Sequence, residues 1–262
     1  MALPSLTIIT PCFNAETYIE QTLESVLSQH YPDLEYLVVD GGSTDRTIEL
    51  VERAGVRYIS EPDEGRPDAI NKGVARTSGE VIGFINADDF YAPGALRRVG
   101  KAFAEHPDAA WLTGECRIID ADGHEIRRAV KRYKNFFLHR FSFPLYLTHN
   151  FVSDPATFVR RSALAEAGPL DPAQRISHDY DLWLRVAQRH RPLVLREELA
   201  SFRMVEGTLS MQTFDLQFRE HAEAARRHGD GHRAAVAMNA VLSRGIVATY
   251  KLLRALRRTR AR

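Results

Sequence analysis

The sequence predicts an α/β fold with a mostly parallel sheet flanked by helices. Short apolar, β-branched runs alternate with segments whose apolar residues recur at helical spacing. Strand–helix–strand alternation of this kind favours a parallel, doubly wound sheet, because each helix returns the chain to the same end of the sheet. The 262 residues suffice for one large domain, and 44% hydrophobic with 26% charged residues is typical of a globular protein.

The first part of the chain contains four expected strands connected by helices. The strands fall at residues 6–10, 35–39, 56–60 and 81–85. The helices between them fall at residues 17–29, 47–54 and 68–77. In the first helix, the apolar side chains at helical spacing are Ile19, Leu23, Val26 and Leu27. We therefore expect these strands to lie side by side in parallel.

Beyond residue 93 the pattern is less regular. Strands are expected at residues 109–113, 117–119 and 156–159, and helices at residues 94–105, 162–167 and 177–188. Residues 120–123, Asp-Ala-Asp-Gly, are typical of a hairpin turn. Residues 131–153 are rich in aromatic and basic side chains and have weak periodicity, which leaves two interpretations: a mobile loop or a substrate-binding face. From residue 214 the chain is expected to be helical with a basic end.

An acidic sequence, Asn86-Ala87-Asp88-Asp89, follows the expected strand at residues 81–85. Ligands of open α/β sheets bind at the carboxyl ends of strands, so these oxygens should face a crevice. Adjacent carboxylates repel, and a hard cation such as Mg²⁺ or Mn²⁺ carrying a diphosphate would compensate them. The alternative interpretation is an ordinary Asx-rich turn.

Two further stretches add polar groups at the same end of the sheet. Asp40 ends the second strand and can accept a hydrogen bond from a nucleobase N–H; the alternative is a strand–helix turn in which Ser43 or Thr44 caps the helix. Arg66 and Lys72 could meet phosphates, and the alternative for both is a solvated helix face.

Asp179 lies in the first turn of the helix expected at residues 177–188. The helix dipole there favours the ionised carboxylate, which suits a general base that must be unprotonated at pH 7. Asp181 is instead expected to pair with Arg185, four residues later on the same helix face.

Taken together and in this order, these stretches resemble glycosyltransferase family 2, inverting enzymes of the GT-A (Rossmann-like) fold that use nucleotide-diphosphate sugars. The resemblance runs from residue 7 to residue 185. The stretches that carry it are Thr-Ile-Ile-Thr-Pro-Cys-Phe-Asn (7–14), Asp-Gly-Gly-Ser-Thr-Asp (40–45), Asn-Lys-Gly (71–73), Asn-Ala-Asp-Asp (86–89) and Asp-Tyr-Asp-Leu-Trp-Leu-Arg (179–185).

The resemblance implies a role for each matching residue. Pro11 and Asn14 would shape the nucleotide pocket, and Asp40 would contact the base. Asn86 and Asp88 stand at the ends of the Asp-x-Asp metal motif of the family, with Asp88 as the direct ligand of Mn²⁺ or Mg²⁺.

Asp89 would orient the metal shell or bind the donor sugar, and Asp179 would deprotonate the acceptor hydroxyl. Two positions depart from the family pattern: Asn86 replaces an aspartate, and His178 replaces the glutamate before Asp179. The missing charge at Asn86 implies either weaker metal binding or an Asn86 that binds the ribose or a metal-bound water.

The implied organisation is a GT-A domain over residues 1–210 and a basic amphipathic helical extension over residues 211–262. Within the domain, residues 1–115 would bind the nucleotide sugar, and residues 116–210 would bind the acceptor and supply the base. The implied activity is metal-dependent transfer to a saccharide or lipid-linked saccharide, in cell-surface polysaccharide or glycolipid synthesis.

Two other functions are weighed against this one. A non-catalytic relative that binds nucleotide sugars would account for Asn86 and His178, although Asp88 and Asp179 are retained. A sugar nucleotidyltransferase would show a Gly-rich loop after the first strand, where this chain has Thr-Pro-Cys-Phe-Asn-Ala. No Gly-x-Gly-x-x-Gly or P-loop motif occurs, which argues against a dehydrogenase or a P-loop enzyme.

Residues 244–262 contain seven Lys and Arg residues and no acidic one, interleaved with apolar residues. Such a helix can lie on an anionic membrane, pack on its own domain or form a homodimer. Nucleic acid is not expected as a partner, because the basic charge is confined to the tail. We expect a cytoplasmic protein, because the two cysteines lack metal-ligand spacing and no signal peptide is recognised. The basic tail would place it peripherally on the inner face of the membrane.

Overall fold

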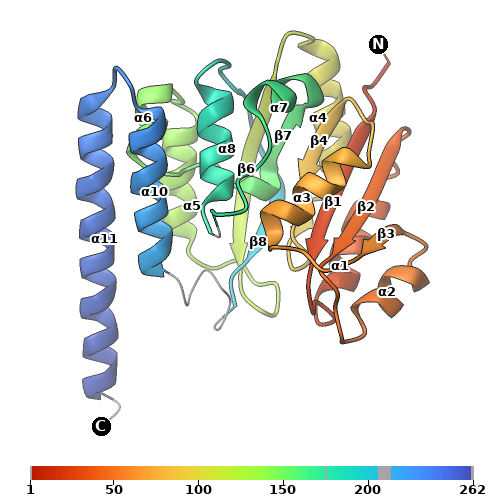
Figure 1. Cartoon of the computed structure of the whole chain (residues 1–262), viewed down its shortest axis with the longest axis horizontal. Coiled ribbons are helices and arrows are strands. Elements are labelled where there is room, and N and C mark those ends of the chain that lie inside the picture. Colours follow the sequence, from red (N-terminus) through yellow and green to blue (C-terminus); the bar gives the residue numbers. More distant parts are fainter. Residues whose placement is uncertain (1, 175, 206–213, 261–262) are drawn as a thin grey trace.

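The computed structural model describes residues 2–174, 176–205 and 214–260. Within them, one sheet of eight strands has the order β3-β2-β1-β4-β7-β6-β8-β5 (Figure 1). The strands are β1 (Leu6–Cys12), β2 (Leu34–Asp40), β3 (Arg57–Ser60), β4 (Val81–Phe84), β5 (Phe90–Tyr91), β6 (Trp111–Ile119), β7 (Thr157–Arg160) and β8 (Leu193–Arg203). The α/β class is confirmed.

The four strands β3, β2, β1 and β4 are all parallel, as the sequence predicts. The register pairs Cys12 of β1 with Asp40 of β2, so the loops that follow both strands leave the same end of the sheet. The crossover helices are α1 (Ile19–Leu27), α2 (Thr47–Arg53) and α3 (Arg66–Ala75). Helix α3 begins two residues earlier than expected, which makes Arg66 its first residue.

The other half of the sheet is mixed. β7 is antiparallel to β4 and β6, whereas β6 and β8 are parallel. The strands expected at 109–113 and 117–119 are one strand, β6, with register irregularities at Glu115. Strands β5 and β8 were not predicted from the sequence. Charged residues 196–198 interrupt the apolar pattern of β8, which is specified by its pairing with β6.

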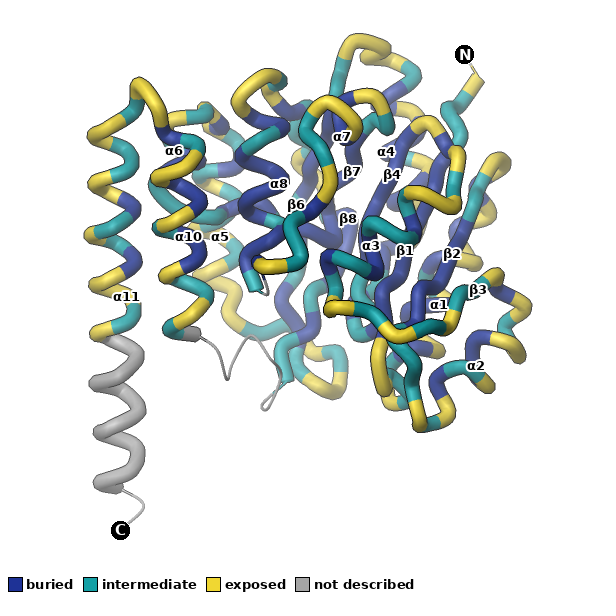
Figure 2. The backbone as a smooth tube through the Cα atoms, viewed as in Figure 1, coloured by how far each residue is buried: buried dark blue, intermediate teal, exposed yellow. Residues whose placement is uncertain are grey.

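Helices cover both faces of the sheet. Buried residues of α1, α2 and α4 (Ala95–Glu105) pack on one face. Buried residues of α3, α7 (Arg161–Ala167) and α8 (His178–Ala187) pack on the other, where the rings of Trp111 and Trp183 stack with centroids 5.7 Å apart. Figure 2 shows the strands buried between these layers. The tight packing on the second face fixes α8 relative to the sheet.

Residues 131–153 are not a loop. They form most of α5 (Arg128–Leu138), all of α6 (Phe143–Thr148) and the approach to a short 3-10 helix, η1 (Asp154–Ala156). The mobile-loop interpretation is therefore wrong. The weak periodicity arises because a turn separates α5 from α6 and because α5 exposes two aromatic side chains, Tyr133 and Phe136.

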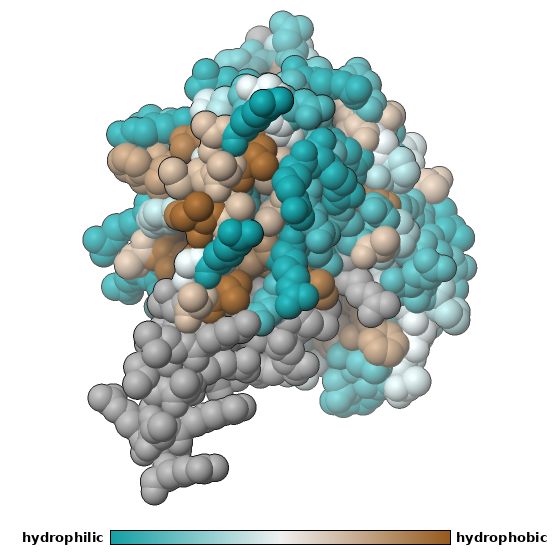
Figure 3. All heavy atoms as spheres, turned by 60° about the vertical axis from the view of Figure 1, so that its left-hand side comes forward, coloured by the Kyte–Doolittle hydropathy of each residue, from teal (hydrophilic) through white to brown (hydrophobic). Residues whose placement is uncertain are grey.

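The C-terminal part is helical, as predicted, with α10 (Phe214–His228) followed by α11 (Arg233–Arg260). Helix α10 packs on α8, and α11 packs on α10 and α6. On this side of the molecule, apolar surface lies between long hydrophilic side chains (Figure 3). Among the helices of the described residues, none combines the length and the hydropathy needed to cross a bilayer. The side chains of the basic tail beyond residue 248 lie outside the described part.

Candidate active site

A cavity of about 1320 Å³ opens at the carboxyl ends of β1 and β4. Six residues proposed from the sequence line it: Pro11, Asn14, Arg66, Asn86, Asp88 and Asp179. The structure thus brings together segments that are far apart in the sequence, from Pro11 to Asp179. Asp40, Lys72 and Asp89 are not among the lining residues.

Asn14 connects the loop after β1 to the turn after β2. Its side-chain oxygen accepts from the Thr44 N–H at 2.9 Å, and its own N–H donates to Ser43 Oγ at 2.7 Å. Its φ of 49° is left-handed, a conformation that asparagine tolerates better than most residues. Asn14 therefore holds one wall of the cavity in place.

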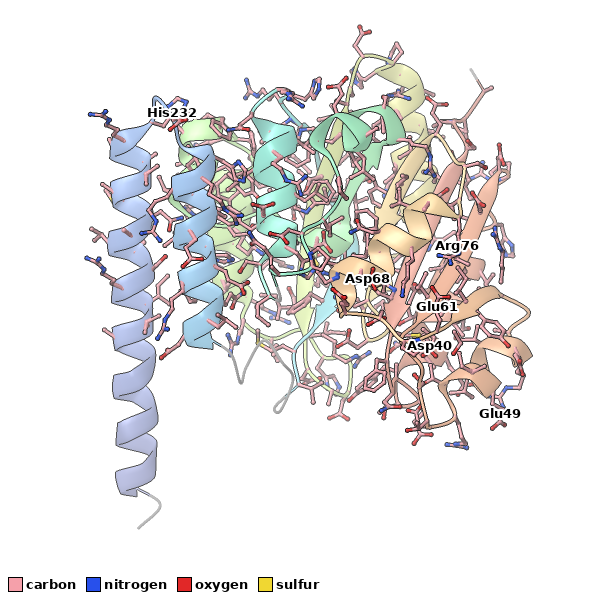
Figure 4. The ribbon with its side chains drawn as sticks, in the orientation of Figure 1. Asp40, Glu49, Glu61, Asp68, Arg76 and His232 are labelled. Carbon is pink, nitrogen blue, oxygen red and sulfur yellow. The ribbon has the colours of Figure 1, made fainter. Side chains whose placement is uncertain are left out.

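Asp40 is fully buried at the end of β2 (Figure 4). Its carboxylate accepts from the N–H groups of Gly42 and Ser43 at 3.1 and 2.9 Å, from the Ser43 hydroxyl and from Ser60 Oγ at 2.6 Å. Burial alone would raise the pKa of Asp40, but these hydrogen bonds outweigh it and lower the pKa. A nucleobase would have to replace one of these donors, and the base contact stays a prediction. Ser43 binds Asp40 and does not cap α2.

Lys72 forms ion pairs with acidic residues of its own helix and of the segment before it, and its side chain is 21% exposed, which is less than a solvated helix face implies. Its Nζ lies 3.1 Å from Asp68 and 3.4 Å from Glu61, and donates to the Pro62 carbonyl at 2.8 Å. Figure 4 labels Asp68 on α3 and Glu61 in the segment before it. The phosphate contact of Lys72 stays a prediction.

Arg66 joins three segments of the chain inside the cavity. Its two terminal nitrogens contact an oxygen of Asp154 and Nε2 of His178, each at 2.5 Å. A guanidinium only donates, so Nε2 accepts, and the imidazole is neutral with its proton on Nδ1. The second oxygen of Asp154 accepts from Trp183 Nε1 at 3.0 Å. The charge of Arg66 is thus balanced by Asp154, and His178 contributes a neutral acceptor.

Asp154 is a site residue that was not predicted from the sequence. The sequence contains a weak indication of its importance: Asp154 is the first acidic residue after Glu125 and follows a long basic and aromatic stretch. A single carboxylate in such a stretch needs a cation, and Arg66 supplies it.

Asp179 lines the cavity from the first turn of α8. Burial, and then the charge of Asp154, raise the pKa of Asp179 to about 6, while Arg66 and Lys134 partly oppose this shift. This rise in the pKa is opposite to the lowering that the dipole of the helix was expected to cause. At pH 7 the carboxylate is still mostly ionised, and a pKa closer to neutrality makes it a stronger general base.

The Asn86–Asp89 turn divides its groups between the cavity and the interior. Asp89 is fully buried and accepts from the Arg203 N–H at 2.8 Å and from Asn86 Nδ2 at 2.9 Å. Burial and the neighbouring Asp88 raise the pKa of Asp89 well above its usual value. Asp89 therefore positions Asn86, and with Nδ2 engaged, Oδ1 is the Asn86 atom available to a cation. The proposed metal-shell or sugar role of Asp89 stays a prediction.

Asp88 lines the cavity, and burial raises its pKa, with Arg66 and Arg203 opposing. The Arg203 guanidinium fixes the backbone here, because it donates to the carbonyls of Asp88 at 3.0 Å and Ala121 at 2.6 Å. The carboxylate of Asp88 and Oδ1 of Asn86 are hard oxygen donors that suit Mg²⁺ or Mn²⁺, and a cation would relieve the cost of burying the ionised carboxylate.

Another group with metal-ligand atoms lies on the hairpin after β6. Ligand atoms of Asp120, Asp122 and His124 lie within 4.8 Å of one another, and Asp122 and His124 are exposed. An oxygen of Asp120 accepts from the backbone N–H groups of Asp122 and His124 at 3.0 and 2.9 Å, which is a turn geometry. The hairpin predicted at residues 120–123 is confirmed by the antiparallel bridge between Ile119 and Glu125.

Helix α10 forms part of the cavity wall. Gln217, Phe218 and His221 line the cavity, and the buried Glu220 accepts from the backbone N–H of Ser177. Asp181 accepts from Arg185 Nε at 3.0 Å, as predicted, and also contacts His228 Nε2 at 2.8 Å. The boundary proposed at residue 210 stays a prediction, but a segment beyond it contributes to the cavity.

Lys134 of α5 also lines the cavity. Its Nζ donates to Ser153 Oγ at 2.9 Å, and burial lowers its pKa. Burial and the charge of Lys134 lower the pKa of His149 to about 4 and that of His221 to about 3. Both imidazoles are therefore neutral at pH 7 and can accept hydrogen bonds at this end of the cavity.

The model of the family described as "Glycosyl transferase family 2" matches residues 7–168. The chain is 33% identical to the O-antigen biosynthesis protein RfbC of Myxococcus xanthus, over 71% of this chain and 14% of that protein. It is 31% identical to a PGL/p-HBAD biosynthesis glycosyltransferase of Mycobacterium bovis, over 71% of this chain and 70% of the relative. The chain spans less than two thirds of the length of the first three curated relatives that it matches, at 14%, 58% and 64%.

Among solved structures, the mannosyltransferase PcManGT from Pyrobaculum calidifontis, in complex with GDP-Man and Mn²⁺, superposes with a TM-score of 0.71. The superposition covers 97% of this chain and 81% of that one at 18% sequence identity, and shows a shared fold.

Proposed function

The chain belongs to glycosyltransferase family 2, and we propose that it transfers a sugar, with inversion, from a nucleotide-diphosphate donor to a saccharide or lipid-linked saccharide. The observation that carries this proposal is one cavity lined by both Asp88 and Asp179. A cation-binding carboxylate and a carboxylate with the pKa of a general base are the two groups that this reaction needs.

At the donor end, Asp88 and Oδ1 of Asn86 would hold Mn²⁺ or Mg²⁺. When bound, the cation supplies positive charge to the leaving diphosphate. Asn14 and Pro11 line the wall proposed for the nucleotide, and Asp40 lies behind it. Arg66 adds a permanent positive charge to the cavity, held by Asp154. The shared fold with the mannosyltransferase PcManGT, which was solved in complex with GDP-Man and Mn²⁺, supports this assignment.

At the acceptor end, Asp179 accepts the proton of the attacking hydroxyl. The acceptor oxygen forms a bond to the anomeric carbon while the bond from that carbon to the diphosphate oxygen breaks on the opposite face. The electron pair of the broken bond leaves with the nucleotide diphosphate, so the configuration inverts. Holding both substrates in one cavity supplies much of the remaining rate acceleration.

A non-catalytic nucleotide-sugar-binding protein is the second candidate. The neutral His178 and the amide of Asn86 favour it, because each stands where the family carries a carboxylate. The raised pKa of Asp179 favours catalysis, since a binding protein does not need a carboxylate poised near neutrality.

We also propose a cytoplasmic location with peripheral contact to the inner face of the cell membrane, through the basic C-terminal helix. Seven basic residues without an acidic one between residues 244 and 262 support this contact. The names of the relatives refer to O-antigen and PGL/p-HBAD biosynthesis, which supports a role in cell-surface polysaccharide or glycolipid synthesis. A homodimer is a further prediction.

The first test is a thermal-shift screen with UDP, GDP, dTDP and CDP, each with Mn²⁺, Mg²⁺ or EDTA. A ligand that binds the folded state raises the melting temperature by mass action. We expect one nucleotide to stabilise the protein only with a cation. No shift with any combination, at ligand concentrations far above plausible dissociation constants, would contradict the donor site.

A further inference from the structure

Helix α5 exposes apolar side chains where a water-facing helix normally carries polar ones. Leu138 is its buried residue, and the opposite side carries Tyr133 and Phe136, which are 49% and 51% exposed. Val130, one turn earlier, is 42% exposed. The outward side of α5 is thus apolar and aromatic.

The same helix is strongly basic, so the basic charge of the chain is not confined to the C-terminal tail as expected from the sequence. Residues 126–153 contain six Lys and Arg residues and no Asp or Glu. Arg128, Arg132 and Arg140 are exposed, and the guanidinium of Arg140 lies 4.0 Å from the ring centroid of Phe136. Arg128 also pairs with Glu125, at 3.2 Å. We define the α5 face as Val130, Tyr133 and Phe136 with these three arginines.

The α5 face borders the substrate cavity. Val130 and Tyr133 are lining residues of that cavity, and so is Ile246 of α11, which is 40% exposed. The edge of the active site and the apolar face are therefore continuous.

We propose that the α5 face docks on an anionic lipid bilayer, so that a lipid-linked acceptor enters the cavity while its lipid stays in the membrane. This inference rests on the proposed function and adds a second membrane contact to the C-terminal helix. Aromatic and aliphatic side chains enter the headgroup boundary of a bilayer, and flanking arginines bind lipid phosphates. The exposed guanidinium groups of Arg132 and Arg140 provide the complementary charge.

A second copy of the chain fits this face less well. A two-fold contact would place the exposed arginines of one copy against those of the other, and it would cover the edge of the cavity. A bilayer instead supplies the opposite charge and presents the acceptor at that edge.

The test is co-sedimentation of the full chain with vesicles of phosphatidylcholine alone or mixed with phosphatidylglycerol. We expect binding to the mixed vesicles, and weaker binding to phosphatidylcholine. Arg132→Gln/Arg140→Gln should reduce partitioning into the mixed vesicles roughly 30-fold, since each arginine near an anionic surface contributes about fivefold. Tyr133→Ser/Phe136→Ser should reduce partitioning into both kinds of vesicle.

The matched control is Arg46→Gln/Arg53→Gln, which removes the same charge from the N-cap residue and the last residue of α2, at the opposite end of the molecule from α11 (Figure 1). Their side chains are 70% and 61% exposed, and we expect wild-type partitioning. Melting curves verify that each variant folds.

Three results would overturn the proposal. In the first, the wild-type protein does not bind the mixed vesicles. In the second, both α5 variants partition like the wild type. In the third, the protein is an oligomer that Tyr133→Ser/Phe136→Ser converts to a monomer without a change in vesicle binding. Cation-dependent stabilisation by a nucleotide reports on the donor site separately. If a nucleotide and a cation stabilise the protein but the protein does not bind vesicles, only the membrane contact is rejected. If the protein binds vesicles but no nucleotide stabilises it, only the donor site is rejected.

Discussion

The carboxylate of Glu220 in α10 accepts a hydrogen bond from the backbone N–H of Ser177 at 2.8 Å, and the same oxygen accepts from Ile176 at 3.0 Å. Ser177 is the N-cap residue of α8, the helix that carries Asp179. An acidic group at this position satisfies N–H groups at the start of the helix and complements its dipole. A helix outside the expected catalytic domain therefore fixes the start of α8.

Glu220→Ala should lower both stability and turnover. The loss of the acceptor leaves the buried N–H of Ser177 and the partly buried N–H of Ile176 unpaired, which costs about 1–3 kcal/mol of unfolding free energy, and it frees the segment before Asp179. Denaturant unfolding and kcat measure the two effects. Glu220→Gln, which keeps one acceptor oxygen, should be milder, and Glu223→Ala, at an exposed position of the same helix, should be neutral. An unchanged kcat in Glu220→Ala would remove Glu220 from the positioning of Asp179.

Asp179→Asn should lower kcat by roughly 100-fold or more, because an amide cannot accept the acceptor proton. Donor binding should be retained, as measured by nucleotide-dependent melting. Asp181→Asn provides the comparison, since Asp181 is bound by Arg185 and His228. It should reduce the unfolding free energy while the chemical step is preserved in the folded fraction. Wild-type turnover in Asp179→Asn would assign the base elsewhere.

The activity should fall on the acid side with an apparent pKa near 6. The base acts only when it is deprotonated, so kcat is full above pH 7 and declines as the pH drops through the raised pKa of Asp179, about 6. Asp154→Asn removes a negative neighbour and leaves Arg66 free to attract Asp179, and both effects shift the acid limb to lower pH. A pH–rate profile of both proteins measures this shift, and an unmoved limb would exclude Asp154 as a cause.

Removal of the cation should abolish nucleotide-dependent stabilisation. We expect EDTA to eliminate the thermal shift, Mn²⁺ or Mg²⁺ to restore it, and Asp88→Asn to prevent the restoration, because a neutral amide is a weaker ligand for a hard cation. Asp122→Asn changes the hairpin group of Asp120, Asp122 and His124 in the same way and should behave as the wild type. The opposite outcome for these two variants would move the metal site to the hairpin.

The sequence predicted the candidate site only in part. Asp88 and Asp179 were found because each sits in a local motif, next to a strand end or a helix start. Asp154, Lys134 and Glu220 were missed, since each acquires its role from a contact with a distant segment: Arg66, Ser153 and Ser177. No spacing rule relates such pairs.

The sequence by itself determined the alternation of strands and helices, the parallel first half of the sheet and the residues at its carboxyl ends. These follow from periodicity and turn chemistry, which are properties of residues close together in the chain. Only the tertiary structure decided that the pKa of Asp179 rises, that Asp40 is already hydrogen-bonded and that α5 exposes its aromatic side. Each depends on desolvation and on charges brought from distant segments, and these exist only once the chain has folded.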